Sequence, residues 1–399
     1  MKIGIIKETK IPVDHRVAFT PTHCKAILEK YPTIQIVVQP SSIRCYKDAE
    51  YSDAGAILSD DVSECDVLFG VKEVKIEKLI PNKTYFFFSH TIKKQPYNKA
   101  LLQNVLEKNI QLVDYECLKD SDGKRVVAFG RWAGIVGAYN GIRTYGLKHK
   151  LFELKPAHLC FDMKELWSEF PKVKLPNIKI LLTGGGRVTR GAQEVLDGLG
   201  IKNVSMPAYT SREYGEPVYI QLDSDAYNKR IDGQAFDYTD FYTNPQHYES
   251  DFKQYLPHTD LLIAGAYWDP KAPVLFTLEE VQSADFKINT IADITCDIEG
   301  SIPTTIRATT INNPFYDFNK VSLKEESAFS NPNNITIMSV DNLPCELPRD
   351  ASTGFGDMLC EYVIPTLLGK EFSEIISGAS ITKSGLLTSK FRYLSDYVA

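Results

Sequence analysis

The stretch IKILLTGGGRVTRGAQEVLDGLG (178–200) constrains the fold of this chain more than any other feature. It begins with an apolar run typical of a buried strand, three glycines (184–186) predict a tight turn, and the apolar positions that follow share one helical face. Gly200 stands where a glycine commonly ends a helix. A strand, a glycine turn and a helix in this order predict dinucleotide binding. The glycines let the backbone approach the pyrophosphate, whose charge lies at the helix N-terminus.

The same stretch leaves the choice between NAD and NADP open. A GxGxxG pattern would place its third glycine at position 189, where this chain has Thr189. The run IKNVSMPAY (201–209) predicts the second strand of the unit. The acidic ribose ligand expected about 20 residues after the glycines is missing, and Met206 and Pro207 stand there instead. Three arginines are candidates for a 2′-phosphate, or are ordinary surface residues: Arg187, Arg190 and Arg212.

Two later apolar runs predict further strands of the same domain. They are TDLLIAGAYWDPKAPVLFT (259–277) and NTIADITCDIEGSIPTT (289–305). Ligands of open α/β sheets bind at the carboxyl ends of the strands. Tyr267, Trp268 and Asp293 are therefore candidates for the nicotinamide end, with simple packing as the alternative for the two aromatic rings.

The first 140 residues alternate apolar runs with helical patterns. Thr20 followed by Pro21 predicts the start of a helix. Continuous apolar strands separated by helices indicate a mostly parallel sheet covered on both faces. A helix rich in small residues (130–146) predicts a connector between domains, or close packing against another helix. The runs that predict strands are KIGII near the N-terminus, 34–38, 66–71, 84–88, 110–114 and 125–129.

Composition excludes several classes of protein. The 399 residues are 43% hydrophobic, enough for about two domains. A net charge of −6 without a basic face argues against a nucleic-acid partner, and no apolar run reaches the roughly 18 residues of a membrane span. The N-terminus lacks the pattern of a signal peptide. The eight scattered cysteines show no metal spacing, so we predict no metal, reduced thiols and a cytoplasmic protein. The oligomeric state stays open.

Two apolar runs each end in a titratable side chain. Lys72 follows the run in DVLFGVKEV (66–74), and His90 follows the aromatic run in YFFFSHTIKKQ (85–95). Both should emerge at one edge of a parallel sheet, where a cluster of charges can shift pKa values towards neutrality. A surface lysine and a structural histidine are the alternatives. Three further titratable residues accompany the pair: Glu73, Lys93 and Glu116.

Several segments resemble the alanine dehydrogenase and saccharopine dehydrogenase superfamily. Its N-terminal half is similar to KETKIPVDHRVAFTP, VKEV, SHTIKKQ and AFGRWAGIVGAYNG. Three later segments resemble the lysine-forming saccharopine dehydrogenases and the lysine–ketoglutarate reductase part of bifunctional lysine-degrading enzymes: TGGGRVTRGAQEV, YWDPKAPVL and SVDNLPCELPRDASTGFGDML. The resemblance runs through nearly the whole chain, and its most specific part is the DNLP…LPRDAS segment.

The resemblance implies an α/β fold of two Rossmann-like domains with parallel sheets and an inter-domain cleft. Residues 1–135 with about 345–399 would form a discontinuous substrate domain, and 136–344 the dinucleotide-binding domain. The implied activity is that of an NAD(P)-dependent saccharopine dehydrogenase of the L-lysine-forming type. Such an enzyme interconverts saccharopine with L-lysine plus 2-oxoglutarate, so its partners are small molecules: an amino acid, a 2-oxo acid and NAD or NADP.

The resemblance also implies roles for individual residues. Lys72 and His90 would be the catalytic pair, and Arg16 would bind a substrate carboxylate with Lys93 and Arg125. Glutamates that tune the pair fall on Glu73 and Glu116. The cofactor-binding residues would be Gly184, Gly186, Arg187, Val188, Tyr267, Asp293 and Asp341.

Two alternative functions stay open. One is reductive amination of a small 2-oxo acid with ammonia, as in alanine dehydrogenase, with the same arginine, lysine and histidine. The other is a non-catalytic sensor of dinucleotides, although such a sensor needs no pair of groups that transfers protons.

Overall fold

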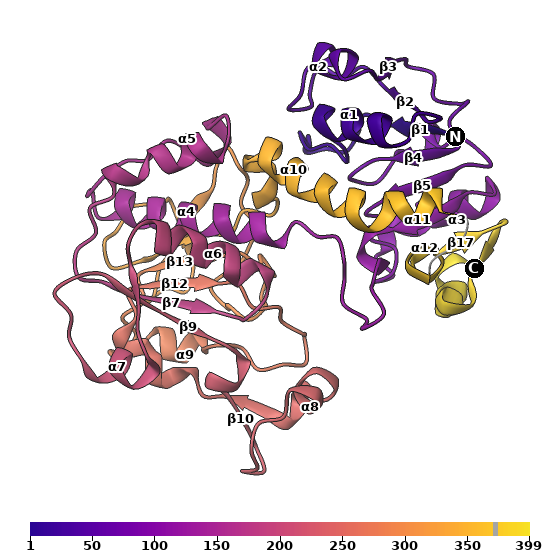
Figure 1. The fold of residues 1–399 in the computed structure, drawn as a ribbon. Coiled ribbons are helices and arrows are strands. Elements are labelled where there is room, and N and C mark those ends of the chain that lie inside the picture. Colours follow the sequence, from indigo (N-terminus) through magenta and orange to yellow (C-terminus); the bar gives the residue numbers. More distant parts are fainter. Residues whose placement is uncertain (370–373) are drawn as a thin grey trace. The chain divides into compact units, whose positions relative to one another are not determined.

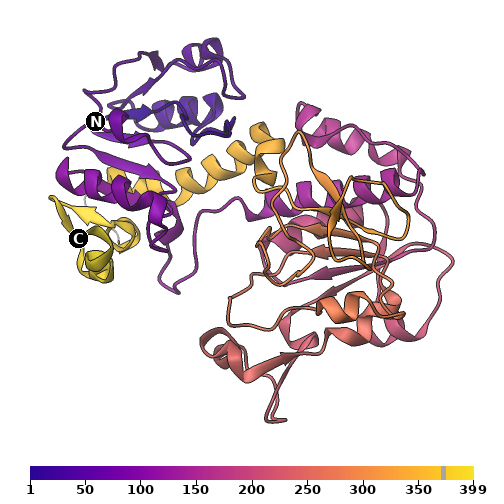
Figure 2. The same cartoon turned by 180° about the vertical axis from the view of Figure 1, so that it is seen from behind.

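The computed structural model describes residues 1–369 and 374–399, which form two compact units. The first unit consists of Met1–Phe129 and Pro348–Ala399, and the second of Gly130–Leu347. In both views, helices pack around a sheet in each unit, and the yellow C-terminal elements lie beside the sheet of the indigo N-terminal segment (Figures 1 and 2). The two units are described separately below.

The first unit contains a six-stranded sheet in the order β3–β2–β1–β4–β5–β6, and every pairing in it is parallel. This confirms the predicted parallel α/β architecture. The predicted strand at 125–129 is wrong: Arg125 forms only an isolated bridge with Lys119, because the sheet already ends at β6. The strands are β1 (Lys2–Ile5), β2 (Gln35–Val38), β3 (Ile57–Leu58), β4 (Val67–Phe69), β5 (Thr84–Phe87) and β6 (Gln111–Asp114).

Helices and a C-terminal hairpin surround this sheet. The predicted start of the first helix is confirmed, since Thr20 caps α1 and Pro21 is its first residue. The helices are α1 (Pro21–Lys30), α2 (Asp48–Asp53), α3 (Lys99–Glu107), α10 (Pro348–Met358), α11 (Ile364–Leu368), α12 (Glu374–Ala379) and α13 (Ser395–Val398). The hairpin pairs β17 (Thr382–Lys383) with β18 (Leu386–Leu387).

The C-terminal segment supplies part of the core of the first unit. The ring of Phe355 on α10 stacks on Phe129 with centroids 4.4 Å apart and meets Tyr115 edge-on at 4.9 Å. The backbone N–H of Ile381 donates to the carbonyl of Leu112 in β6 at 2.8 Å. Two chain segments that are far apart in sequence therefore share one hydrophobic core.

The second unit contains an eight-stranded sheet in the order β15–β14–β16–β13–β12–β7–β9–β8. All its pairings are parallel except those of β14, which runs antiparallel to β16 and β15. The predicted strands within 259–277 and 289–305 are confirmed as β12 and β13. The strands are β7 (Lys179–Thr183), β8 (Lys202–Asn203), β9 (Val218–Leu222), β12 (Leu261–Ala264), β13 (Thr290–Asp293), β14 (Phe315–Phe318), β15 (Glu325–Glu326) and β16 (Ile335–Met338).

The second strand of the dinucleotide unit differs from the prediction. The neighbour of β7 is β9, whereas the predicted run 201–209 contributes only the two-residue edge strand β8. Pro207 cannot donate to a sheet ladder and favours the first turn of a helix. The chain accordingly enters helix α7 (Met206–Ser211) instead of continuing the strand.

The helix rich in small residues is α4 (Gly130–Lys148), which lies wholly in the second unit and packs closely against α6 (Arg187–Gly198). A Cβ atom on Gly134 would lie 1.8 Å from the carbonyl oxygen of Val188, and one on Gly191 would lie 2.0 Å from that of Arg131. Close helix packing, the alternative to the predicted connector between domains, is thus what the structure shows, since the whole helix belongs to the second unit. The remaining helices of the unit are α5 (Met163–Ser168), α8 (Tyr238–Thr243) and α9 (Leu278–Val281).

A separate two-stranded hairpin in the second unit pairs β10 (Asn228–Arg230) with β11 (Tyr248–Ser250) in antiparallel fashion. In the described parts of both units, no helix has the length and apolar character needed to cross a membrane.

Candidate active site

Lys72 lies just beyond the carboxyl end of β4, as predicted, and its backbone is held by Glu8, which follows β1. The Glu8 carboxyl group accepts hydrogen bonds from the N–H groups of Val71 at 2.7 Å and Lys72 at 2.9 Å. The amine of Lys72 is partly buried in this turn. Because the carboxyl group of Glu8 binds two successive backbone amides, it holds the backbone of Lys72, and with it the start of the side chain, in place.

The surroundings of the Lys72 amine disfavour its charged form. Burial and the nearby charge of Arg16 lower the pKa of Lys72, and Asp14 opposes part of that shift. Both effects follow from the cost of placing a cation in a site that is poorly solvated and already positive. A lysine in this state accepts a proton more readily near neutral pH than an exposed lysine does.

His90 follows β5, and the structure places it in a charge network with Glu73 and Lys10. Its Nδ1 lies 2.5 Å from Glu73 Oε1, and Lys10 Nζ donates to Glu73 Oε2 at 2.8 Å. Burial alone would raise the pKa of Glu73, but hydrogen bonds from His90 and Lys10 lower it to about 2. Glu73 is therefore a carboxylate at neutral pH that orients the imidazole ring.

The backbone of His90 is in the left-handed region, with a φ of 51°. Few non-glycine residues adopt this conformation, and it is most often found where the surroundings demand it. The ring of His90 lies nearly parallel to that of Phe88, with centroids 6.3 Å apart. The packing of Phe88 and the contact with Glu73 together set the position of the imidazole.

Arg16 is buried and forms a two-pronged ion pair with Asp14. Its Nε donates to Asp14 Oδ1 at 3.0 Å and its Nη2 to Oδ2 at 2.6 Å, while the guanidinium lies 4.1 Å from the centroid of the Phe129 ring. Burial disfavours the charge of Asp14, but the guanidinium outweighs that cost and lowers the pKa of the carboxyl well below its usual range. Asp14 thus holds a buried cation beside Lys72.

Arg125 and Glu116 form a looser pair around Phe88. Arg125 Nη1 lies 3.7 Å from Glu116 Oε1, and the guanidinium carbon lies 5.5 Å from the centroid of the Phe88 ring. In the described part of the chain, Glu116 Oε2 is buried without a hydrogen-bond partner. Since His90 also stacks on Phe88, the side chains of Arg125, Glu116 and His90 share one neighbourhood.

The structure therefore gathers most of the predicted residues of the first unit at the carboxyl ends of β1, β4, β5 and β6. Lys93 is the exception, because it lies exposed in the turn that follows His90. The catalytic and substrate-binding roles inferred for the set stay predictions. Three members of the cluster were not predicted: Glu8, Lys10 and Asp14.

In the second unit, the glycine turn has the backbone form that a pyrophosphate requires. Gly184 has a φ of +99°, a conformation that strongly favours glycine. Gly186 is the N-cap of α6, and no side chain caps that helix end or places an acidic group in its first turn. Arg187 and Val188 begin the helix. Thr189 replaces the third glycine without loss of packing, since its hydroxyl donates to the carbonyl of Thr183 at 3.2 Å.

An acidic residue stands beside the turn after all. Asp223 follows β9 directly, and a Cβ atom on Gly185 would lie 2.2 Å from its Oδ2. Its carboxylate thus borders the glycine turn, at the end of the strand where Rossmann folds carry the acid that binds the ribose 2′-hydroxyl. No acid stands about 20 residues after the glycines, as expected, but Asp223 comes later in the chain because β8 and α7 precede β9.

The other predicted cofactor residues lie at carboxyl ends of the same sheet, in different settings. Tyr267 follows β12 and is 78% exposed, whereas the Trp268 indole donates to the carbonyls of Ala272 and Pro273 at 3.2 and 3.1 Å. Asp293 ends β13 and is fully buried, and it accepts hydrogen bonds from the loop that follows. Asp341 lies exposed beyond β16.

Two family models match the chain. The model described as alanine dehydrogenase/PNT, N-terminal domain, matches residues 4–136, and the model of the alanine dehydrogenase/PNT C-terminal domain matches residues 169–395. The chain belongs to the alanine dehydrogenase/PNT family. The resemblance predicted from the sequence motifs is confirmed, and the family matches together cover both units.

Curated relatives of this alanine dehydrogenase/PNT family member include alpha-aminoadipic semialdehyde synthases. That of Arabidopsis thaliana is 31% identical over 98% of this chain and 41% of the relative, and the mitochondrial enzyme of Mus musculus is 34% identical over 96% and 46%. The chain thus spans less than half the length of these relatives. A relative of similar length is saccharopine dehydrogenase [NAD(+), L-lysine-forming] of Yarrowia lipolytica, 26% identical over 92% of both chains.

Among solved structures, an L-alanine dehydrogenase matches over 100% of both chains, with a TM-score of 0.69 and 16% identity. At this identity the similarity concerns the fold. It confirms the predicted α/β architecture with parallel sheets.

Proposed function

We propose that this chain is an NAD-dependent oxidoreductase that interconverts saccharopine with L-lysine plus 2-oxoglutarate. The observation that carries the proposal is the placement of Lys72, whose amine pKa is lowered by burial and by Arg16, near Glu73, which in turn contacts the imidazole of His90. The names of the matched relatives, saccharopine dehydrogenase and alpha-aminoadipic semialdehyde synthase, support the choice of substrate.

Residues of the second unit fit a dinucleotide. The left-handed Gly184 and the side-chain-free cap at Gly186 leave room for a pyrophosphate at the N-terminus of α6. Asp223 fits a ribose 2′-hydroxyl and would repel a 2′-phosphate, which supports NAD over NADP. When bound, the nicotinamide supplies the hydride acceptor or donor. We assign Arg187 and Val188 to the same turn and Tyr267 and Asp341 to the surrounding loops, whereas the bonds of Asp293 suit holding its loop.

Lys72 and His90 divide the proton transfers. Oxidation of a secondary amine requires its nitrogen to lose a proton so that its lone pair can assist departure of the hydride. Lys72, whose pKa is lowered by burial and by Arg16, takes that proton. The imine that results must add water. Glu73 holds Nδ1 of His90, so Nε2 is the nitrogen that takes the proton from the attacking water and returns it as the C–N bond breaks.

The remaining groups of the cluster suit a substrate with several carboxylates and an amine. Arg16 and Arg125 provide guanidinium groups, which bind carboxylates in two-pronged fashion, and we assign Lys93 to the same task. The buried Oε2 atom of Glu116, unpaired within the described residues, can accept a hydrogen bond from a substrate amine. We assign this site to small-molecule substrates. All eight cysteines are free thiols, which supports the cytosol as the compartment of the protein.

The activity is tested by following NADH oxidation with 2-oxoglutarate plus L-lysine, and in parallel with pyruvate plus ammonium. We expect turnover with the first mixture only. Turnover with the second mixture alone would instead make the protein an alanine dehydrogenase-like enzyme. Tight NADH binding without turnover in either mixture would favour a non-catalytic dinucleotide-binding protein.

Replacing Asp223 by serine should change the preference between the two nucleotides. A hydrogen bond to a charged group contributes about 1.5–3 kcal/mol, so the NADH to NADPH ratio of kcat/KM should fall by about 10–100-fold. Steady-state kinetics with both nucleotides measure the ratio. Asp285→Ser removes an exposed charge elsewhere in the same unit and should leave it unchanged. An unaltered ratio in Asp223→Ser would show that this carboxylate does not contact the ribose.

A further inference from the structure

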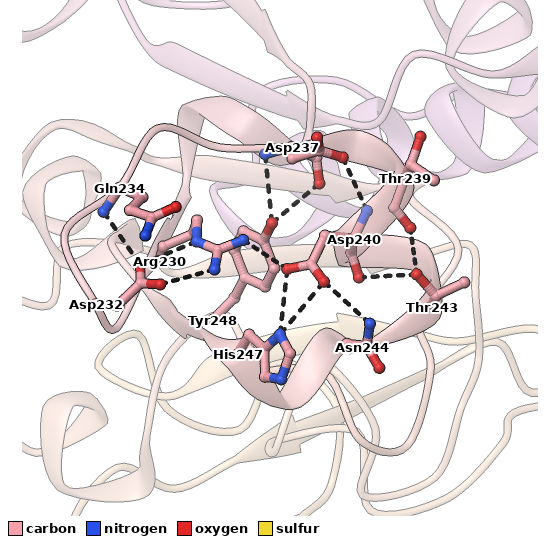
Figure 3. Close-up of polar contacts among 10 residues, drawn as sticks. All are labelled: Arg230, Asp232, Gln234, Asp237, Thr239, Asp240, Thr243, Asn244, His247 and Tyr248. Carbon is pink, nitrogen blue, oxygen red and sulfur yellow. Dashed lines mark hydrogen bonds and ion pairs between the residues drawn. The ribbon is translucent and has the colours of Figure 1, made fainter.

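A polar cluster fastens helix α8 to the hairpin β10–β11 (Figure 3). The Asp240 carboxylate, on α8, is its centre. Oδ2 of Asp240 accepts from Arg230 Nη1 at 2.7 Å and lies 3.2 Å from His247 Nδ1, while Oδ1 accepts from Asn244 Nδ2 at 3.0 Å. One carboxylate thus ties the helix to the first strand of the hairpin and to the turn before the second.

The start of α8 is fixed as well. Asp237 caps the helix by accepting from the backbone N–H of Asp240 at 2.9 Å, and the Tyr248 hydroxyl donates to the carbonyl of Asp237 at 3.0 Å. Below these bonds, the ring of Phe241 meets Tyr248 with centroids 5.0 Å apart. A helix of only six residues has little stability of its own, so these side-chain contacts determine where it lies.

Helix α8 forms part of the wall of a cavity in the second unit. Phe241 and Tyr242 line it from α8, while Thr183, Ser224 and Ala266 line it from the carboxyl ends of β7, β9 and β12. Further aromatic rings line the same cavity: Tyr227, Tyr267 and Trp268.

The chemistry of the walls suits a nucleoside base attached to an unphosphorylated ribose. Flat aromatic rings stack on bases of any kind. Asp223 immediately precedes the lining residue Ser224. Burial and, to a smaller extent, the charge of Asp223 raise the pKa of Tyr242. The α8 aromatic therefore stands near the carboxylate that we assign to the ribose hydroxyl, so base and ribose of one nucleoside can occupy neighbouring positions.

We propose that α8 is a cover over the adenosine half of the dinucleotide, and that Asp240 is the positioning residue that holds this cover in place. The inference rests on the proposed binding of NAD by the second unit. Asp240 lies outside the lining of the cavity, so it acts only through Phe241 and Tyr242.

Removing the Asp240 carboxylate should selectively weaken binding of the adenosine half of the dinucleotide. In the 399-residue chain, Asp240→Ala should weaken ADP-ribose binding and raise KM for NADH by about tenfold each, with kcat within twofold. Reduced nicotinamide mononucleotide, which lacks adenosine, should show unchanged KM in the same variant. Equal losses with NADH and the mononucleotide, or ADP-ribose affinity within twofold of the parent chain, would overturn the proposal.

The hairpin provides a matched control. Asp232 binds the same arginine, accepting from Arg230 Nε at 2.9 Å and Nη2 at 2.7 Å, and among the residues drawn in Figure 3 no polar contact joins it to α8. Asp232→Ala should keep ADP-ribose affinity within twofold. If both variants lose ADP-ribose affinity equally, the loss comes from the hairpin as a whole and not from the contacts of Asp240 with α8.

A second variant guards against a folding defect in Asp240→Ala. Tyr242 is 63% exposed, so Tyr242→Ser should fold normally, and it removes an aromatic wall of the cavity. We expect about tenfold weaker ADP-ribose binding, and an unchanged affinity would overturn the assignment of the cavity. Calorimetry with ADP-ribose needs no turnover. An inactive chain that still binds ADP-ribose would refute the proposed activity alone, whereas a chain that does not bind it would refute the adenosine cover.

Discussion

Replacing Lys72 by methionine should lower turnover by about 10²–10⁴-fold, the range that a positioned proton acceptor contributes. Methionine keeps the length of the side chain but cannot take the proton of the secondary amine. The affinity for NADH should stay within a few-fold, because Lys72 belongs to the first unit and the glycine turn to the second. Single-turnover kinetics and NADH fluorescence titration measure the two quantities separately.

An exposed lysine in the same segment offers a control for the loss of positive charge. Lys75 lies three positions further on and is exposed, so Lys75→Met should turn over at the parent rate. Near-normal turnover in Lys72→Met would exclude this amine as the base. Equal losses in both variants would mean that net charge near the loop, and not a proton acceptor, limits the rate.

Replacing Glu8 by glutamine should stabilise the protein at alkaline pH. Burial and the nearby Asp14 raise the pKa of Glu8 from 4.5 to about 8, so the folded state holds this proton more tightly than the unfolded chain does. The stability contributed by the protonated group is fully present below about pH 4.5 and is lost as the pH rises towards 8. A shift of this size corresponds to on the order of 5 kcal/mol.

Glutamine cannot ionise, and its amide oxygen can still accept from the N–H groups of Val71 or Lys72. The excess in unfolding free energy of Glu8→Gln over the parent chain should therefore grow between pH 5 and pH 9, as measured by urea unfolding at each pH. Glu77, an exposed glutamate, serves as the control, because Glu77→Gln should show a difference that does not vary with pH. A constant difference for Glu8→Gln as well would mean that Glu8 is ionised in the folded protein.

The sequence pattern was enough to predict the α/β fold and the glycine turn. It also predicted that Lys72 and His90 follow two different strands. These features depend on local signals: apolar runs, glycines and the rule that parallel strands end at a common edge. The role of Glu8 lies beyond such signals, since its hydrogen-bond donors stand 63 and 64 positions away in sequence. Only the pairing of β1 with β4 brings them together.

Asp223 escaped prediction for a different reason. The rule that places the ribose acid about 20 residues after the glycines assumes a short connection to the second strand. Here a two-residue edge strand and helix α7 precede β9, so the acid comes later in the chain while keeping its place in space. The run at 125–129 led to a wrong strand prediction. Val126 and Val127 are buried in the core, as apolar residues usually are, but they pair with no neighbouring strand.

The contact between α4 and α6 also bears on how sequence variants of this protein should be interpreted. At Gly134 and Gly191 the two backbones touch, so even a methyl group would wedge the helices apart. The helix displaced by such a wedge is the one whose first turn carries Arg187 and Val188. An alanine at either glycine would thus lower the affinity for the nucleotide, although neither glycine contacts it. A survey limited to ligand residues would classify such a variant as harmless.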